Sequence, residues 1–213
     1  MTSTTSGGAP AQERKLRTQG RKTLRKLLDA AIIVFERRGY HAARVDDIVK
    51  VAKTSHGTFY LYFANKEDLF RALLADVSDE MTALSESLGD IGPTRAGYDE
   101  LRTWLASFFA LYHRYHPVIR AWTESEVGDS ELGELGVSVL SGFTRALMRR
   151  IRHLEAGSAL DPAIAAMAMV AMIERFSYYV ESRDMGVDRE EMLDTLTTIL
   201  HVGVFGGARR RTK

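Results

Sequence analysis

The chain has 213 residues, of which 45% are hydrophobic and 27% are charged, a composition typical of an ordinary globular protein. It contains no cysteine, which excludes disulfides and thiolate metal sites, and no run approaches the ~18 uninterrupted apolar residues of a membrane-spanning helix. The N-terminal segment lacks the apolar centre of a secretory signal, so we expect a cytoplasmic protein with no membrane partner.

The net charge of +1 conceals an uneven distribution. Residues 1–66 carry 13 Lys and Arg against 5 Asp and Glu, whereas the remainder carries 16 against 23. A basic disordered tail beside an average domain would account for part of this asymmetry. Eight of the basic residues, however, lie after Lys22, in the part of residues 1–66 that is predicted to fold. We therefore favour a basic surface that binds a polyanion, attached to an acidic body.

Helical spacing of apolar residues begins near residue 21, and no stretch alternates strictly enough to predict a strand. The first predicted helix ends at Gly39, after two arginines that suit a helix C-terminus. A short second helix is predicted over 45–52. A third is capped by Thr54 or Ser55 and ends near Phe63, and Asn65 caps a fourth.

The stretch "SLGDIGPTRAGYDE" predicts a loop, and longer apolar helices follow it. The helix over 98–115 is expected to break or kink at Pro117, because proline disfavours a helical residue before it. A loose segment is predicted over 128–136. Three further helices are predicted over 137–154, 161–184 and 189–204, which gives an all-α fold of about nine helices.

The two short helices have the proportions of a helix-turn-helix, whose second helix enters the major groove of DNA. Gly57 in the second of them costs about 1 kcal/mol relative to alanine. A bare backbone there would let the helix approach a base or a phosphate closely. Tyr60 and Tyr62 are predicted to face outward, and Phe59 and Phe63 inward. The alternative is that both tyrosines pack inside a small helical domain.

The segment "GYHAARVDDIVKVAKTSHGTFYLYFANKEDLF" closely resembles the DNA-binding region of TetR-family (TetR/AcrR-like) transcriptional repressors. The resemblance covers about 45 residues and rests on a specific pattern. Elsewhere the chain is similar to the family only in length, helical character and apolar closing helices. The matching positions are Gly39-Tyr40, Asp47-Ile48, Gly57-Thr58-Phe59-Tyr60, Phe63 and Lys66-Glu67-x-Leu69.

Composition predicts a disordered basic arm (1–20) and a tail (209–213). The resemblance implies that the chain between them forms a helix-turn-helix DNA-binding domain (21–66) and an effector-binding and dimerisation domain (67–208). It assigns base contacts to His56, Gly57, Thr58 and Tyr60, and phosphate contacts to Tyr62 and Lys66 and more weakly to Thr54 and Ser55.

Two positions depart from the family pattern. Arg44 replaces a small hydroxyl residue that opens the second helix, and it cannot cap although it can hold a phosphate. Lys53 replaces the usual glycine of the turn and adds a further candidate phosphate contact.

The resemblance also implies a homodimer formed by the last two helices, which binds a palindromic operator. Two recognition helices must lie about one DNA turn apart, roughly 34–36 Å, to read two half-sites. The helix over 161–184 is apolar beyond one stripe, which suits a dimer interface. It also suits a central helix buried on most sides.

Family members usually carry an effector cavity between the middle helices, and the resemblance implies a small hydrophobic effector here. Each candidate lining residue is individually also compatible with ordinary core packing. Glu174 and Arg175 could anchor a polar group or lie at the dimer surface. The candidate lining residues are Trp104, Phe108, Tyr112, Trp122, Met148, Met169, Met172 and Phe176.

His113 and His116 lie three residues apart, a spacing that some metal sites use, but no third ligand accompanies them. We expect neither a metal site nor a cofactor. The sequence contains no nucleophile-base pair, phosphate loop or paired carboxylates, so we do not expect an enzyme. The sequence thus predicts a ligand-released repressor, or alternatively a DNA-binding activator or architectural factor without an effector.

Overall fold

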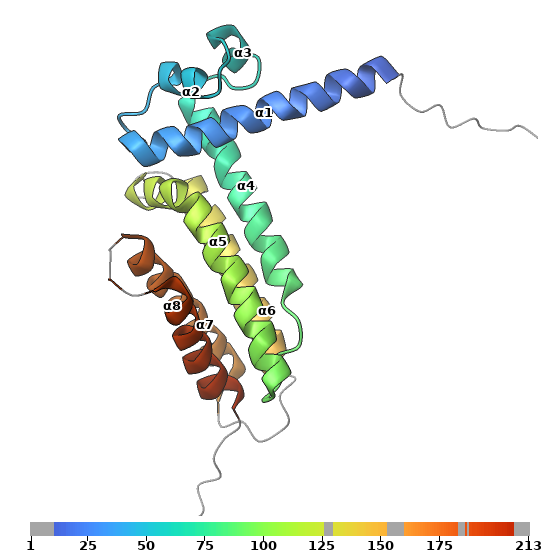
Figure 1. Ribbon diagram of the computed structural model, residues 1–213, viewed down its shortest axis with the longest axis vertical. Helices are drawn as coiled ribbons and strands as arrows, with labels where there is room; N and C mark the ends of the chain where they lie inside the picture. The colour runs from blue at the N-terminus through green and yellow to red at the C-terminus, as the bar shows by residue number, and fades with distance from the viewer. Residues whose placement is uncertain (1–10, 126–129, 153–159, 183–185, 187, 207–213) are drawn as a thin grey trace, which may run out of the picture. The chain divides into compact units, whose positions relative to one another are not determined.

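The structure is a computed structural model that describes residues 11–125, 130–152, 160–182, 186 and 188–206. Within these residues it contains eight α-helices and one π-helical turn, and no strand (Figure 1). The prediction of an all-α fold with about nine helices is therefore confirmed. The predicted tail over 209–213 lies outside the described residues.

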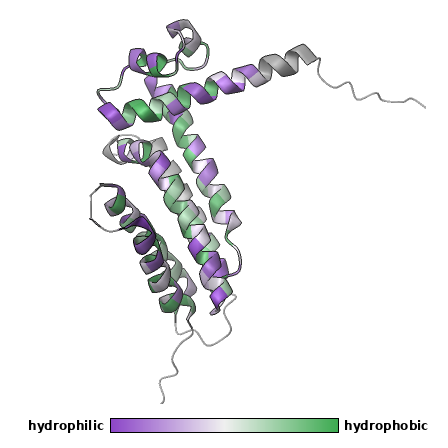
Figure 2. Cartoon of the chain, in the orientation of Figure 1, coloured by the Kyte–Doolittle hydropathy of each residue, from purple (hydrophilic) through white to green (hydrophobic). Residues whose placement is uncertain are grey.

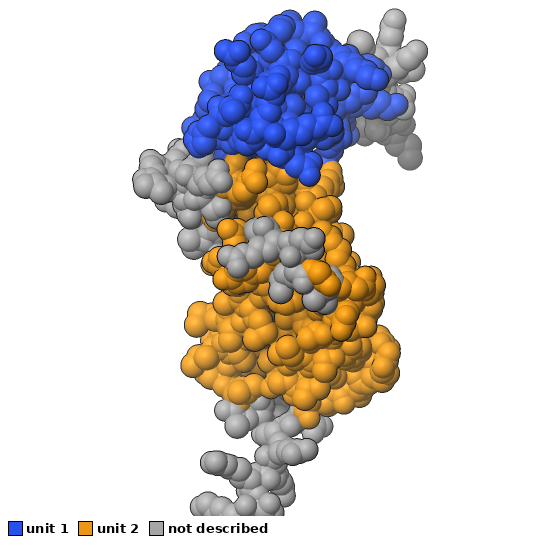
Figure 3. Space-filling view, turned by 60° about the vertical axis from the view of Figure 1, so that its left-hand side comes forward, with its two compact units in different colours: residues 1–73 blue, residues 74–213 orange. Residues whose placement is uncertain are grey.

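The chain divides into two compact units, Met1–Leu73 and Leu74–Lys213 (Figure 3). This division falls inside a helix, α4 (Lys66–Ser87), rather than at the predicted domain boundary after Lys66. The first turns of α4 therefore belong to the same compact unit as the helix-turn-helix.

The first unit contains α1 (Ala11–Arg38), α2 (Val45–Val51), α3 (His56–Tyr60) and the start of α4. Both hydrophilic and hydrophobic residues occur along the coloured part of α1 (Figure 2). Residues 11–20, which we expected to form a disordered arm, are helical, and residues 1–10 lie outside the described part. The segment "AQERKLRTQ" consists largely of good helix formers, so the packed part of α1 can extend toward the N-terminus.

Aromatic side chains form the centre of the first unit. Phe35 and Phe59 are fully buried, and Phe63 is nearly so, with its ring centroid 5.7 Å from that of Phe59. Phe35 in turn contacts Phe70 of α4 edge to face, with the centroids 6.0 Å apart. The predicted inward orientation of Phe59 and Phe63 is confirmed, and it fixes which face of α3 is left for solvent.

Lys66 connects the start of α4 to the loop between α1 and α2. Its Nζ donates to the carbonyl oxygens of Tyr40 at 2.9 Å and Ala43 at 3.2 Å, and it lies 4.4 Å from the centroid of the Tyr40 ring. Burial raises the pKa of the Tyr40 hydroxyl to about 12, and the nearby Glu67 carboxylate adds to the shift. The ammonium thus satisfies backbone acceptors that precede α2.

The second unit contains the rest of α4 together with α5 (Arg95–Ser125), α6 (Ser130–Arg152), α7 (Pro162–Ser182), α8 (Arg189–Leu200) and the π-helical turn η1 (His201–Phe205). α6 packs against α7, and α5 packs against both α7 and α8 (Figure 1).

The sequence predicts two interruptions of these helices. α5 continues through Pro117, so of the break or kink predicted there the break does not occur. A proline removes one backbone hydrogen bond, but a helix of this length keeps the others. α6 starts at Ser130, inside the segment predicted to be loose over 128–136. Glycine in a helix costs only about 1 kcal/mol, which does not end a helix by itself.

Polar contacts tie α5 to α8 and to α7. Arg102 of α5 binds Glu190 at 2.6 Å and Asp194 at 2.5 Å, both on α8. His113 of α5 lies 2.7 Å from the Glu181 carboxylate of α7. α5 is therefore held on two sides, which fixes its side chains opposite α7.

α7 presents apolar side chains on two opposite faces. At 3.6 residues per turn, Ala165, Ala166, Met169, Ile173 and Ser177 form one stripe, and all are buried. The opposite stripe is exposed and includes Ile164, Met167, Met172, Tyr178 and Tyr179.

The segment Pro162–Glu181 is therefore apolar overall, with a mean hydropathy of 1.3, and is long enough to cross a membrane. A helix that packs against protein on two sides is equally long and apolar. The two stripes of α7 fit such a helix better than a membrane span, because one stripe is already packed against protein.

We expect Lys66→Ala to lower the free energy of unfolding by about 1 to 3 kcal/mol, because it leaves two backbone carbonyls without their donor. Urea denaturation followed by circular dichroism measures the change. Lys50→Ala is the matched control, since Lys50 is an exposed lysine of the same unit. Equal losses in the two variants would contradict the assigned role of Lys66.

Candidate nucleic-acid interface

The start of α2 is stabilised by an acidic side chain. The Asp47 carboxylate accepts from the backbone N–H of Arg44 at 3.3 Å and lies 3.4 Å from the guanidinium of Arg38. Arg44 occupies the N-cap position, but its side chain, which has no acceptor, makes no cap hydrogen bond. Its guanidinium is exposed, as a phosphate contact requires.

The turn between α2 and α3 contains Lys53 with a φ of 51°, the only positive φ of a non-glycine residue in the described parts of the chain. This left-handed conformation costs an L-residue roughly 1–2 kcal/mol. It gives the physical reason for the glycine that the family usually has at this position. The Lys53 side chain is exposed.

Ser55 caps α3 and fixes its start. The Ser55 Oγ accepts from the Thr58 backbone N–H at 3.1 Å and lies 3.0 Å from the Thr58 Oγ1. The two hydroxyls are thus engaged with each other. Because Phe59 is buried, the exposed side of α3 consists of His56, Gly57 and Tyr60.

Gly57 is not required by the fold of the protein itself. Its φ is not positive, and a Cβ added there would meet only the Ser55 Oγ, at an ordinary contact distance of 3.7 Å. The bare backbone therefore leaves open space on the outer side of α3, where another molecule can come close.

His56 is connected to α2 by a contact that the sequence did not predict. Its Nε2 lies 2.5 Å from the Asp46 Oδ1. Asp46 also lies in the first turn of α2, where the helix dipole favours a carboxylate. The contact spans the turn and orients the imidazole on the outer side of α3.

The remaining aromatic residues divide between the two orientations that the sequence allowed. Tyr60 is 58% exposed, as predicted. Tyr62 is half-buried, and its hydroxyl lies against α1, where a Cβ on Gly20 would be 3.5 Å away. Leu61, between them, is 82% exposed and was not predicted as a contact residue. An exposed leucine beside a reading helix can contact a thymine methyl group.

Of the ten predicted contact residues, Lys66 is placed least like a phosphate ligand. Two of its three N–H donors are used by the carbonyls of Tyr40 and Ala43. Thr54 is half-buried in the turn, and its backbone N–H donates to Val49. The exposed basic and polar groups on the outer surface are Arg44, Lys53, His56 and Tyr60, together with the bare backbone of Gly57.

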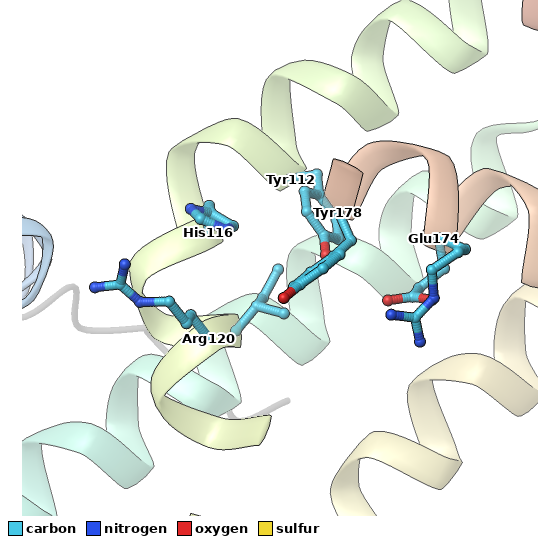
Figure 4. A pocket seen from close by; sticks show the side chains of 7 residues that line it. Tyr112, His116, Arg120, Glu174 and Tyr178 are labelled. Carbon is cyan, nitrogen blue, oxygen red and sulfur yellow. The ribbon is translucent and has the colours of Figure 1, made fainter. Parts of the chain in front are cut away.

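The second unit contains a cavity of about 240 Å³ between α5 and α7 (Figure 4). Tyr112, His116, Ile119 and Arg120 line it from α5. Glu174, Arg175 and Tyr178 line it from α7.

This lining differs from the predicted one. Of the eight candidate residues, only Tyr112 lines the cavity. Trp104, Phe108 and Met169 are buried in the core instead, and the Trp104 Nε1 donates to the Leu84 carbonyl at 2.8 Å. Met172 is exposed on the outer stripe of α7, and the remaining three, Trp122, Met148 and Phe176, are half-buried.

The two histidines considered as metal ligands make different contacts. His113 contacts Glu181, whereas His116 lines the cavity. No group of three or more His, Asp or Glu side chains that could hold a metal occurs among the described residues.

A basic helix-turn-helix with a capped second helix, an exposed reading face and a separate helical unit defines a DNA-binding regulator. The family model for bacterial regulatory proteins of the tetR family matches residues 27–73. The chain is 25% identical over 191 residues to the fatty acid metabolism regulator protein of Bacillus subtilis. The aligned region covers 87% of this chain and 97% of that protein. A shorter match to the transcriptional regulator YdgC of the same organism is 40% identical over 73 residues, 34% of this chain and 37% of that one.

Among solved structures, a tetR-family regulatory protein from Rhodococcus RHA1 superposes with a TM-score of 0.66 at 20% identity, covering 88% of this chain and 98% of that one. This similarity extends the shared fold well beyond the matched DNA-binding region. Residues 27–73, which contain the helix-turn-helix, are thus similar to the TetR family of transcriptional regulators, and most of the chain shares the fold of a solved tetR-family protein.

We expect Gly57→Ala to leave the protein at least as stable, because its Cβ meets no close contact and alanine favours a helix by up to about 1 kcal/mol. Specific DNA affinity should fall at least about tenfold, because the methyl group occupies the space that the duplex needs. Fluorescence anisotropy with a duplex selected by the unmodified protein measures the affinity. Gly142→Ala in α6, where a Cβ also finds room, is the control and should keep full affinity. Unchanged affinity in Gly57→Ala would contradict close approach at this position.

We expect Lys53→Gly to have opposite effects on stability and on DNA binding. Relief of the positive φ should raise the free energy of unfolding by about 1 kcal/mol. Loss of one phosphate contact should lower the salt dependence of DNA affinity by about one unit of slope. Lys53→Arg keeps both the charge and the strain, and should change neither quantity. An unaltered slope in Lys53→Gly would remove Lys53 from the interface.

Proposed function

We propose that the protein is a homodimeric repressor that binds an inverted-repeat operator and is released from it by a small-molecule effector. The observation that carries the proposal is the exposed face of α3, where Gly57 leaves the backbone bare without any need in the fold. In a helix-turn-helix the N-terminal residues of the second helix meet the base edges, and His56, Gly57 and Tyr60 occupy that part of α3.

The dimer part of the proposal is supported by the exposed stripe of α7. Large apolar side chains are exposed along it at helical spacing, and Ile199 and Val202 of α8 and η1 are exposed as well. Contiguous apolar surface of this kind marks an interaction site in soluble proteins. A second copy of the same chain would cover it with the same surface and would supply the second reading head.

Release by an effector requires that the ligand bind the DNA-incompetent state more tightly than the DNA-competent one. The cavity between α5 and α7 is the candidate effector site. The name of the related Bacillus subtilis protein connects it with fatty acid metabolism, which is compatible with control by a metabolite. The polar lining departs from the hydrophobic effector that the sequence suggested. We propose a cytoplasmic regulator without enzymatic activity.

The alternative is a DNA-binding factor without an effector, either an activator or an architectural protein. Selection of DNA sites from a random duplex pool at physiological salt tests the leading proposal. Recovery of an inverted repeat with half-sites about one helical turn apart would support it. Tight low-salt binding that yields no motif would refute a sequence-specific repressor.

We expect Met167→Glu to shift the protein from dimer to monomer, because it places a charge within the exposed apolar stripe of α7. Sedimentation velocity measures the shift, and affinity for an inverted repeat should fall with it. Ser107→Glu, at an exposed position of α5, is the matched control and should remain dimeric. A fully dimeric Met167→Glu would place the interface elsewhere.

A further inference from the structure

His56 of α3 and Asp46 of α2 form a pair across the turn of the helix-turn-helix. The His56 Nε2 lies 2.5 Å from the Asp46 Oδ1, although ten residues separate the two in the chain. The side chains are 54% and 72% exposed, so the pair lies on the surface of the first unit. Exposed pairs of charged groups contribute little to stability, so stability alone does not account for this contact.

Asp46 differs in its contacts from the neighbouring Asp47. The Asp47 carboxylate accepts from the backbone N–H of Arg44 and lies 3.4 Å from the guanidinium of Arg38, so it stabilises the start of α2. Asp46 makes neither contact, and within the described residues its carboxylate contacts the imidazole of His56. The two acids of this turn therefore have different roles, and Asp46 is the one that contacts α3.

The contact determines which part of the His56 ring is left for another molecule. A carboxylate has no hydrogen to donate, so the Nε2 must be the donor in this pair. The Nδ1 and the ring edge beside it remain available. The contact also restricts rotation of the ring, and a side chain that is ordered in advance loses less entropy when it binds. His56 is the first residue of α3, where the second helix of a helix-turn-helix meets base edges.

The negative charge of Asp46 is unfavourable for DNA affinity as such. A carboxylate beside the reading face repels the phosphates of every duplex, whatever its sequence. Asp46 also lies in the first turn of α2, where the helix dipole favours an anion, but Asp47 already supplies an anion to the same turn. A group that opposes affinity in general can still serve the choice between sequences, because specificity is a difference between affinities.

We propose that Asp46 is a positioning residue for sequence recognition. It holds the imidazole of His56 in the orientation in which the ring contacts one base pair of the operator, and it does not itself touch DNA. This inference rests on the proposed DNA-binding function and deepens it. It adds to the reading residues of α3 a side chain that belongs to α2.

Selection of sites from a random duplex pool with the unmodified protein supplies the DNA for the test. Fluorescence anisotropy then measures the affinity of each variant for the selected duplex, for duplexes with one base pair changed, and for a scrambled duplex. We expect His56→Ala and Asp46→Ala to lose about fivefold or more of the discrimination at the same base pair. Full discrimination in Asp46→Ala would overturn the proposal.

The scrambled duplex separates a positioning role from a merely structural one. Asp46→Ala should bind it at low salt as well as the unmodified protein or better, because one negative charge has been removed. Loss of helix-turn-helix structure would instead lower the affinity for every duplex. A uniform fall of that kind in Asp46→Ala would overturn the proposal.

A double-mutant cycle tests whether Asp46 acts through His56. In the His56→Ala background, Asp46→Ala should cause no further loss of discrimination, because the side chain that it positions is absent. A further loss, or a loss at a different base pair, would mean that Asp46 contacts DNA itself or acts on another residue. Either result would overturn the proposed role.

Asp46→Asn separates the hydrogen bond from the charge. The amide oxygen can accept from the Nε2 as the carboxylate does, so this variant should keep most of the discrimination that Asp46→Ala loses. Glu36→Ala removes an exposed carboxylate of α1 in the same unit and is the control that should keep all of it. Equal losses in Asp46→Asn and Asp46→Ala would assign the effect to the charge and would overturn the proposal.

Failure of this inference is distinguishable from failure of the proposed function. If the unmodified protein selects no motif, the proposed function fails and the role of Asp46 fails with it. If the unmodified protein selects an inverted repeat and Asp46→Ala discriminates equally well, only the role of Asp46 fails.

Discussion

The candidate DNA-reading surface depends on the burial of one phenylalanine. α3 has only five residues, and a helix of that length is not stable alone in water. Phe59 is fully buried, and its contact with Phe63 continues the aromatic packing into the core of the first unit. The Ser55 cap and the His56–Asp46 contact then fix the start of the helix. The outer face of α3 is thus held rigid by groups on its inner face, as a surface that must match DNA requires.

The features that the sequence predicted depend on residues that lie close together in the chain. The inward orientation of Phe59 and Phe63 follows from their spacing of four residues, and the position of the turn follows from the cap residues. The role of Lys66 did not follow, because its two acceptors are backbone carbonyls 26 and 23 residues earlier. No pattern of side-chain types specifies such a contact. The strain at Lys53 was only hinted at by the glycine that the family usually has there.

The cavity could not be predicted for a different reason. Its lining joins Tyr112 and Arg120 of α5 to Glu174 and Tyr178 of α7, and only the packing of the two helices brings them together. Large apolar residues such as Trp104 and Phe108 were reasonable candidates by residue type, but they are buried in the core and do not line the cavity. Composition identifies side chains that can be buried, and packing decides which of them face empty space.

The exposed stripe of α7 also bears on the fate of a single copy of the chain. A lone copy presents Ile164, Met167 and their neighbours to water, and such a surface attracts chaperones, proteases and other unfolded chains. The proposed dimer would favour the folded state by mass action, so survival of the protein would depend on its own concentration. The lifetime of newly synthesised chains would then be shortest when few copies are present. Scarcity of the regulator would tend to reinforce itself, which favours a sharp boundary between cells that contain the regulator and cells that do not.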